Sequence, residues 1–595
     1  MIRRHPSDVA RRSRVASWIV ATAMLLLVAG FFRNQVMRHA SYALQSETNR
    51  LREVPVPAAR GMILDRRNEV IADNRMGHAV SVFALQEDTL RAVVQRMSRI
   101  VAVAPGTVDR AVRQFRLTST RPAVVIANAS PDIASTLEQH RAELPGLVIQ
   151  DAPRRFYPDG AVVSSFAGYV GDVSEADLSV RGAAGYKAGQ QVGKQGLEQQ
   201  YDSTLRGKDG SRFVEVDASG RVMKAAGERQ DLPPIAGTDV HTNIDLALQR
   251  VIAKLFADSL QGGVVALDPN TGGVLALYSA PGWDGNRFVA GVTARYWDSL
   301  LTNPRRPLYN RALQASYPPG SIWKLATAAI ALETNTARMT DRMPIACTGG
   351  MQVGSRYFRC WDASGHGSLD LKGAIAKSCD VYFYQLGIKL GLSRLVAGGV
   401  AMGFQRKSGI DLPGEIAPRF PESTQYFDRT YGRSRWTNAV VLDMATGRGD
   451  NAQTVIGMAR FYSALAGDGS AARPSIAVAP VERSEVMKLT AQQLQQIREA
   501  LAGVPARGTA SASVMRGVQL AGRAGTAQSG TVDPATGREL THSWFVGFAP
   551  ASKPSIVVAV MIEFGGHGTR AAAIASRIIQ AYLHVAPVVD MSVEG

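Results

Sequence analysis

The chain contains a serine and a lysine whose spacing suits nucleophilic chemistry. Ser321 follows the tight sequence Tyr-Pro-Pro-Gly, and Lys324 comes three residues later. Residues 321–331 are apolar on nearly every side and rich in good helix formers, which predicts a buried helix with both side chains on one face. The positive end of such a helix favours a developing alkoxide at Ser321, while burial lowers the pKa of Lys324 and makes it a base. Ser-x-x-Lys alone recurs by chance, so this interpretation depends on further motifs.

A second hydroxyl and a carboxylate follow in the sequence Ala-Lys-Ser-Cys-Asp, which ends at residue 380. Because neighbouring side chains point different ways, we expect Ser378 and Asp380 to face Lys324 and Cys379 to face away. Ser378 would then relay a proton to a leaving amine. The alternative use of Ser378 or Asp380 is to cap the helix that follows, and the two uses are compatible.

The third motif is Arg-Ala-Gly-Thr at residues 523–526. Arg523 can bind a substrate carboxylate through two hydrogen bonds. Gly525 has no side chain, so a substrate backbone can approach it closely. Thr526 adds a hydroxyl and a backbone N–H, which we expect to form an oxyanion hole with the N–H of Ser321.

All three cysteines of the chain, Cys347, Cys360 and Cys379, fall close together in the sequence, with His366 among them. One hypothesis is a tetrahedral zinc site with three thiolates and one imidazole. The other is a disulfide between Cys347 and Cys360, which leaves Cys379 as a free thiol. The residues alone do not choose between them.

Residues 15–32 contain no charge and are just long enough to cross a membrane once. Five arginines lie within residues 1–14, so the positive-inside rule places that tail in the cytoplasm and the rest of the chain outside. A cleaved signal peptide is the alternative, although the apolar run is longer than a usual signal core.

The composition of the 595-residue chain is that of a globular protein, with 46% hydrophobic residues and a net charge of +17. The basic residues are spread out and lack aromatic partners. This pattern predicts acidic partners such as lipid headgroups or a polyanionic wall, and it argues against nucleic acid.

The order of the predicted elements suggests two regions outside the membrane. Residues 33–236 alternate strands, turns and helices, including helices at 89–115 and 131–144, and we interpret them as an α+β pedestal without a site. Residues 237–588 have one predicted hairpin at 263–279 and a second that pairs 543–549 with 555–563. The stretch between the hairpins is helical, and further helices are predicted at 245–260 and 568–583, so we expect one antiparallel sheet flanked by helices. Residues 589–595 are left as a C-terminal tail.

The three motifs, in this order, resemble the penicillin-binding protein and serine β-lactamase superfamily. The chain is most similar to class B, monofunctional penicillin-binding proteins of the elongation subtype. The segments that carry this closer resemblance are Arg60–Arg66, Gly193–Glu198, Tyr317–Ser321, Ser-Cys-Asp-Val-Tyr-Phe-Tyr and Arg-Ala-Gly-Thr-Ala-Gln.

The resemblance implies an α/β transpeptidase domain on an elongated pedestal, anchored in the bacterial inner membrane and facing the periplasm. It implies a serine-type D-Ala-D-Ala transpeptidase/carboxypeptidase, an acyl transferase that cross-links peptidoglycan stem peptides through a Ser321 acyl-enzyme during elongation and shape maintenance. Catalysis would need no cofactor, and β-lactams would be inhibitors. The implied partners are a SEDS-type glycosyltransferase and other elongation proteins.

One departure from the family pattern concerns the third motif. The family has Lys-[Ser/Thr]-Gly where this chain has Arg523, Ala524 and Gly525. Charge is kept, but arginine cannot donate a proton at neutral pH, so any acid role of the family lysine is in doubt. This departure favours the alternative of a non-catalytic scaffold or β-lactam sensor that activates a partner polymerase. A β-lactamase or a carboxypeptidase would not need the pedestal and the anchor.

Overall fold

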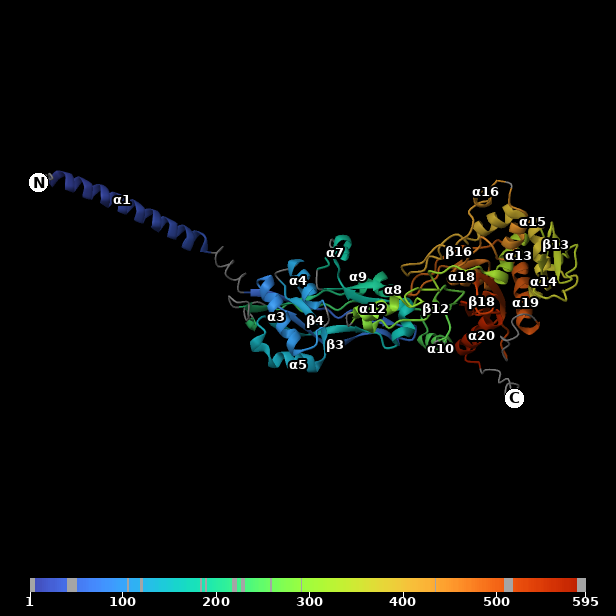
Figure 1. The fold of residues 1–595 in the computed structure, drawn as a ribbon, viewed down its shortest axis with the longest axis horizontal. Helices are drawn as coiled ribbons and strands as arrows, with labels where there is room; N and C mark the ends of the chain where they lie inside the picture. Colours follow the sequence, from blue (N-terminus) through green and yellow to red (C-terminus); the bar gives the residue numbers. More distant parts are fainter. Residues whose placement is uncertain are drawn as a thin grey trace.

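The computed structural model shows an elongated molecule, with an isolated helix at one end and the C-terminal domain at the other (Figure 1). The structure describes residues 6–39, 51–103, 106–117, 121–181, 185–187, 190–216, 222–225, 231–256, 259–289, 292–433, 435–507 and 517–585. The predicted tail, residues 589–595, lies outside these ranges.

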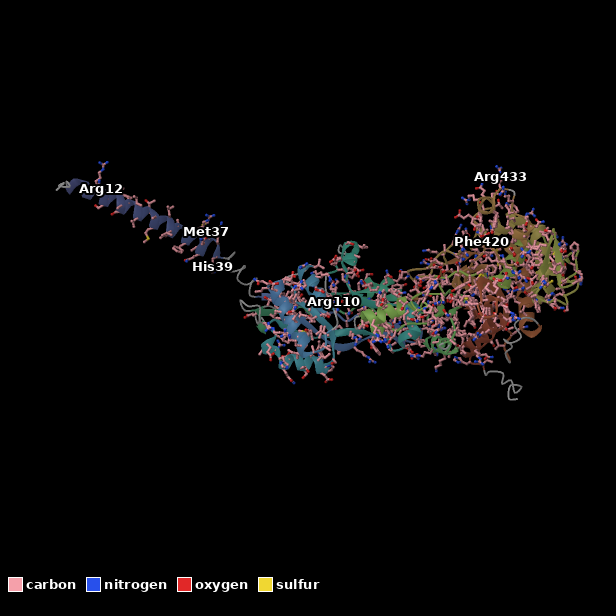
Figure 2. The ribbon with its side chains drawn as sticks, in the orientation of Figure 1. Arg12, Met37, His39, Arg110, Phe420 and Arg433 are labelled. Carbon is pink, nitrogen blue, oxygen red and sulfur yellow. The ribbon has the colours of Figure 1, made fainter. Side chains whose placement is uncertain are left out.

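Helix α1, Pro6–Phe32, continues into a π-helical turn, Arg33–Met37, and carries the predicted membrane segment. Within residues 10–37, a window of 18 residues has a mean hydropathy of 2.2. None of that window is buried against the rest of the protein. Figure 2 shows Arg12 near the outer start of this helix and Met37 and His39 at its other end, which lies nearer to the rest of the molecule. By length and composition the helix can cross a membrane.

The pedestal is built from two main sheets and the helices packed on them. The larger sheet has β3 beside β2, β4 and β5, with β10 pairing parallel to β2, and the smaller has the order β1-β8-β9. The strands are β1 Leu51–Val56, β2 Ile63–Leu64, β3 Val70–Val82, β4 Ala123–Ala129, β5 Leu147–Phe156, β6 Tyr169–Asp172, β7 Gln191–Gln195, β8 Gly210–Val216, β9 Val222–Ala225 and β10 Val240–His241. The helices are α3 Glu87–Ile100, α4 Thr107–Leu117, α5 Pro131–Gln139, α6 Ser164–Ala167, α7 Glu175–Arg181, α8 Gly196–Gln200 and α9 Asp202–Leu205.

The single helix predicted over residues 89–115 is wrong, because the structure has two helices there. After α3 the backbone at Val101 is extended, with φ −130° and ψ 150°, and Gly106 has φ +77° before α4 begins. The Ala-Pro-Gly sequence that ends at Gly106 is unfavourable inside a helix and explains the break. The helical spacing of apolar residues continues on both sides of it, which is why one helix was predicted. The second predicted helix begins as expected, with the Ser130 hydroxyl accepting from the Ile133 N–H, although α5 ends at Gln139.

A buried ion cluster joins two of the sequence segments quoted above. Glu198 is fully buried and accepts hydrogen bonds from Arg60 Nη2 at 2.7 Å and from Arg155 Nε at 2.5 Å. Arg60 also pairs with Asp202 at 2.9 Å. Each charge in this cluster depends on the others, because an unpaired ion in the interior is costly.

The C-terminal domain is organised around one antiparallel sheet with strand order β12-β11-β19-β18-β17. The two predicted hairpins are confirmed, since β11 pairs with β12 and β18 with β19. The strands are β11 Gly262–Leu267, β12 Val274–Ala280, β17 Ala521–Val532, β18 Glu539–Ala549 and β19 Ile556–Ile562. Helices α10 Leu246–Phe256 and α20 Thr569–Leu583 share a core with one face, and the central helices share a core with the other.

The central helices position the candidate site. They comprise the 3-10 turn Gly320–Trp323, α13 Lys324–Glu333, α14 Leu371–Lys377, α15 Asp380–Ala401, α17 Asn438–Ala445, α18 Val455–Ala466 and α19 Ala491–Arg507. Smaller elements complete the domain, namely α11 Asn286–Val289, α12 Ala294–Leu301, α16 Gln425–Tyr431 and the strand pairs β13 Gly350–Val353 with β14 Arg356–Arg359 and β15 Ser470–Ala472 with β16 Arg483–Glu485.

Candidate active site

Ser321 lies on the 3-10 turn that leads into α13, one turn earlier than the helix proper. The sequence predicted a helix from residue 321, but the Pro-Pro-Gly approach tightens the first turn and α13 begins at Lys324. Gly320 has φ +56°, and a Cβ there would lie 2.9 Å from the carbonyl oxygen of Thr526. Only glycine tolerates both conditions, so the turn can rest against strand β17. Ser321 itself is partly exposed.

Several residues that the sequence did not identify hold this turn in place. Gly320 N–H donates to the carbonyl of Gly447 at 2.9 Å, and the Tyr462 hydroxyl donates to the carbonyl of Ile322 at 3.0 Å. The indole N–H of Trp544 donates to the carbonyl of Pro318 at 3.1 Å. These bonds come from distant parts of the chain, so no local pattern announces them.

Lys324 is completely buried and binds the second motif. Its Nζ donates to the Ser378 carbonyl at 2.8 Å and to Asp380 Oδ1 at 2.8 Å, and it lies 3.3 Å from Ser378 Oγ. The structure therefore brings together the two motifs that the sequence proposed as partners. A proton can pass between the amine and the Ser378 hydroxyl at this distance.

The charges around Lys324 act against one another. Burial lowers the pKa of Lys324, and the positive charges of Arg523 and Arg448 lower it further, while Asp380 opposes them. For Asp380, burial works to raise the pKa, but the charges of Lys324 and Arg448 outweigh it and the pKa is lowered. The site thus holds a charged carboxylate beside an amine that gives up its proton more readily than usual.

The backbone at the second motif turns sharply between two helices. Ser378 ends α14 in the left-handed region, with φ +56°, and Asp380 is the first residue of α15. A non-glycine residue pays a strain cost for that conformation, which the Lys324 bonds offset. Asp380 Oδ2 also accepts the backbone N–H of Trp361 at 3.1 Å. Because of this turn, the side chains of Ser378 and Asp380 point to Lys324, and that of Cys379 points to Cys347, Cys360 and His366.

Strand β17 brings the third motif next to Ser321. A Cβ on Gly525 would lie 3.1 Å from the carbonyl of Pro319, so the strand passes directly beside the turn. Thr526 is exposed, and its hydroxyl accepts the N–H of Gly568 at 3.1 Å. Because β17 is the last strand of the described sheet, its outer edge offers unpaired backbone groups to an extended peptide.

Arg523 is placed differently from the other members of its motif. Its side chain is 0% exposed, and Nη1 donates to the carbonyl of Ile375 at 2.6 Å. Burial lowers its pKa to about 10. The guanidinium is therefore enclosed beneath the site, where it acts on Lys324 through its charge, and Thr526 is the member of the motif that faces solvent.

A second arginine near the site was missed by the sequence analysis. Arg448 Nη2 lies 4.0 Å from Asp380 Oδ1, and its side chain is 40% exposed. The local signal was the sequence Gly-Arg-Gly at residues 447–449, in which two glycines allow a tight loop around one charged residue.

The four cysteine and histidine residues converge on one point below the second motif. The Sγ atoms of Cys347, Cys360 and Cys379 and one ring nitrogen of His366 all lie within 4.8 Å of one another. His366 Nδ1 lies 3.6 Å from Cys347 Sγ and 3.5 Å from Cys360 Sγ. All three cysteines are free thiols in this structure, so the predicted Cys347–Cys360 disulfide is not formed here. The neighbouring Cys379 thiol donates to Cys360 and lowers the pKa of Cys360 below its ordinary value, which favours the thiolate.

Two family models match the chain. The model described as penicillin binding protein transpeptidase domain matches residues 262–580, and the model described as penicillin-binding protein dimerisation domain matches residues 55–242.

Individual relatives match over nearly the full length. The chain is 30% identical over 585 residues to the peptidoglycan D,D-transpeptidase MrdA of Acinetobacter baumannii, which covers 95% of this chain and 86% of the relative. It is 26% identical, with a TM-score of 0.77, to the penicillin-binding protein PBP2 of Helicobacter pylori solved as a complex with MreC, over 90% of this chain and 99% of that one. A chain from a structure on the coordination of polymerization and crosslinking by a peptidoglycan synthase complex is 28% identical, with a TM-score of 0.69, over 97% of this chain and 99% of that one.

Proposed function

Because the chain belongs to the penicillin-binding protein transpeptidase family, we propose that Ser321 is the nucleophile and that Lys324, Ser378 and Asp380 serve it. The protein is a class B, elongation-type peptidoglycan D,D-transpeptidase. The observation that carries the residue assignment is the position of Lys324 Nζ, 2.8 Å from Asp380 and 3.3 Å from Ser378 Oγ and one turn from Ser321.

The reaction begins when Lys324 takes the proton of Ser321. The serine oxygen bonds to the carbonyl carbon of the penultimate D-Ala, and the bond to the terminal D-Ala nitrogen breaks. Ser378 passes the proton from Lys324 to the departing amine. An amine of a neighbouring stem peptide then attacks the ester carbonyl, the bond from that carbon to the Ser321 oxygen breaks, and the proton lost by the amine passes through Lys324 to the Ser321 oxygen. Attack by water instead gives the carboxypeptidase reaction.

Strand β17 is proposed to hold the stem peptide. Its free edge can bind the peptide backbone as an added strand, and Gly525 leaves room for the close approach. The exposed Thr526 hydroxyl meets the terminal carboxylate, and its N–H joins that of Ser321 in the oxyanion hole. Because Arg523 is enclosed, it contributes positive charge to this region without touching the substrate.

Labelling of the full-length protein with a fluorescent penicillin tests the nucleophile. The wild type is expected to become labelled, and Ser321→Ala is expected to lose all label while keeping its thermal unfolding temperature. A neighbouring hydroxyl variant, Ser364→Ala, serves as the control because Ser364 is exposed. Absence of label on a folded wild type would instead favour the scaffold or sensor alternative.

We also propose that Cys347, Cys360, His366 and Cys379 hold a structural zinc ion. Zinc–sulfur and zinc–nitrogen bonds of about 2.3 and 2.05 Å at a tetrahedral angle place sulfur and nitrogen about 3.6 Å apart. The observed separations of 3.6 and 3.5 Å fit this edge, and the donor set is typical of closed structural sites. The ion would brace the loop before Ser378 and takes no part in the acyl transfer.

The membrane orientation and the partners complete the proposal. The arginines before the apolar helix favour a cytoplasmic N-terminus, with the pedestal and the transpeptidase domain in the periplasm. Strand polymerisation is assigned to a SEDS-type glycosyltransferase and the wider assembly to elongation proteins, contacted through α1 and the pedestal. Support comes from the similarity to PBP2 solved with MreC and to a chain of a peptidoglycan synthase complex.

A further inference from the structure

The loop at residues 447–449 packs on the turn that carries Ser321 and brings the Arg448 guanidinium to Asp380. Gly447 accepts the Gly320 N–H at 2.9 Å, and a Cβ at Gly447 would lie 2.5 Å from the Gly320 carbonyl oxygen. Gly447 and Gly449 have φ values of +75° and +66°. The loop therefore packs on the Ser321 turn only because both positions are glycine, and Arg448 is fixed between them.

The charge of Arg448 is incompletely matched by its neighbours. Asp380 Oδ1 already accepts Lys324 at 2.8 Å and Oδ2 accepts the Trp361 N–H at 3.1 Å, whereas Arg448 Nη2 remains 4.0 Å away. The other groups near the guanidinium are the Tyr384 hydroxyl and the carboxyl of Asp443, whose pKa burial raises. At 4.0 Å Arg448 makes no hydrogen bond to Asp380, so its guanidinium keeps N–H donors for a further acceptor.

Arg448 is also the accessible one of the two arginines that act on Lys324. Its side chain is 40% exposed, whereas that of Arg523 is fully enclosed and bonded to the Ile375 carbonyl. A partly exposed guanidinium, carried on a loop between two glycines of positive φ, can bind a planar anion from solution through two hydrogen bonds.

The position of Arg448 selects which part of the substrate it meets. The Ser321 turn is contacted by β17 through the Thr526 carbonyl and by the loop through Gly447. With the leaving D-Ala held at Thr526, the acyl portion of the donor is left to the opposite side of the turn, where Arg448 reaches solvent above the buried Ser378 and Asp380. We propose that Arg448 is a specificity-determining residue that binds a carboxylate carried on the acyl side of the scissile bond.

This inference rests on the proposed function. A matched pair of penicillins distinguishes a failure of the inference from a failure of the proposed function. Benzylpenicillin and its α-carboxy derivative, carbenicillin, differ by one carboxylate on the acyl side chain. The measured quantity is the ratio of their second-order acylation rate constants on full-length protein in detergent. Arg448→Gln is expected to lower the carbenicillin-to-benzylpenicillin ratio about tenfold, because one charge-assisted contact is lost. Arg448→Lys is expected to fall between Arg448→Gln and the wild type, because charge is kept and the planar fork is lost.

The control is Arg433→Gln, which changes an exposed arginine of the same domain that lies at the top edge of this domain in Figure 2. Its ratio should equal that of the wild type. An unchanged ratio in Arg448→Gln overturns the inference while leaving the proposed function intact. An equal fall for both penicillins also overturns it, because Arg448 would then act only through Asp380 and Lys324. If Arg448→Gln does not fold, Arg448→Lys decides by the same ratio. No labelling of the wild type by either penicillin would defeat the proposed function itself.

Discussion

Replacement of Asp380 by asparagine tests the charge pair at the centre of the site. The side chain keeps its shape, so the bond from the Trp361 N–H to the side-chain oxygen can persist. What disappears is the negative charge 2.8 Å from Lys324 Nζ, in a place where the lysine is 0% exposed. Lys324 is then left without its counter-ion and is driven toward the neutral amine.

The size of the effect follows from the distance and the burial. Two unit charges 2.8 Å apart attract each other by about 6 kcal/mol at an effective dielectric constant of about 20. Loss of one partner of a buried pair therefore lowers the free energy of unfolding by about 3–5 kcal/mol. The pKa of Asp380 lies below its ordinary value of 3.8, so its contribution is fully present above pH 3.8 and is lost as the pH falls through the lower folded pKa. The stability difference between wild type and variant should be large at pH 7 and shrink in acid.

The assay combines thermal unfolding with the pH dependence of penicillin acylation. Because Asp380 opposes the lowering of the Lys324 pKa, its removal should move the acid limb of the acylation rate to lower pH. Asp298→Asn, which changes an exposed carboxylate on α12, should leave both measurements unchanged. If Asp380→Asn still acylates and its acid limb coincides with that of the wild type, Lys324 is not the titrating base and the reasoning fails.

Three further predictions concern the supports of the site. Gly320→Ala should abolish penicillin acylation while the protein stays folded, because the new Cβ would lie 2.9 Å from the Thr526 carbonyl at φ +56° and must displace the turn; an acylation rate like that of the wild type would contradict the close approach. Glu198→Gln should lower the free energy of unfolding by about 3–5 kcal/mol, because Arg60 and Arg155 lose their buried counter-ion, and an unchanged unfolding transition would rule out this role. Purified protein should contain close to one zinc per chain by metal analysis and Cys379→Ser should contain far less, whereas zinc-free wild type with oxidised Cys347 and Cys360 would support the disulfide.

Much of the site could be predicted from the sequence because its parts are local. Ser321 and Lys324 are one turn apart, Ser378 and Asp380 flank a single residue, and the hairpins are marked by their turns. Spacing and turn chemistry decide such features. The convergence of the cysteines and His366 also followed from residue type, since four soft donors in a short stretch are rarely unrelated.

The features that the sequence did not reveal depend on contacts between distant segments. The burial of Arg523 on strand β17 depends on its contact with Ile375 of helix α14, and the place of Arg448 depends on the fit of Gly447 against Gly320. The helix break near Val101 was missed because apolar periodicity continues across it. Tertiary packing decides each of these features, and a short stretch of sequence carries no information about the distant residues that pack against it.

The elongated outline in Figure 1, with α1 at one end and the catalytic half at the other, sets a working height for the chemistry. If α1 anchors the chain as proposed, the length of the pedestal limits how far from the lipid the transpeptidase domain can reach. A variant with a shorter or longer pedestal would then cross-link peptidoglycan at a different distance from the membrane.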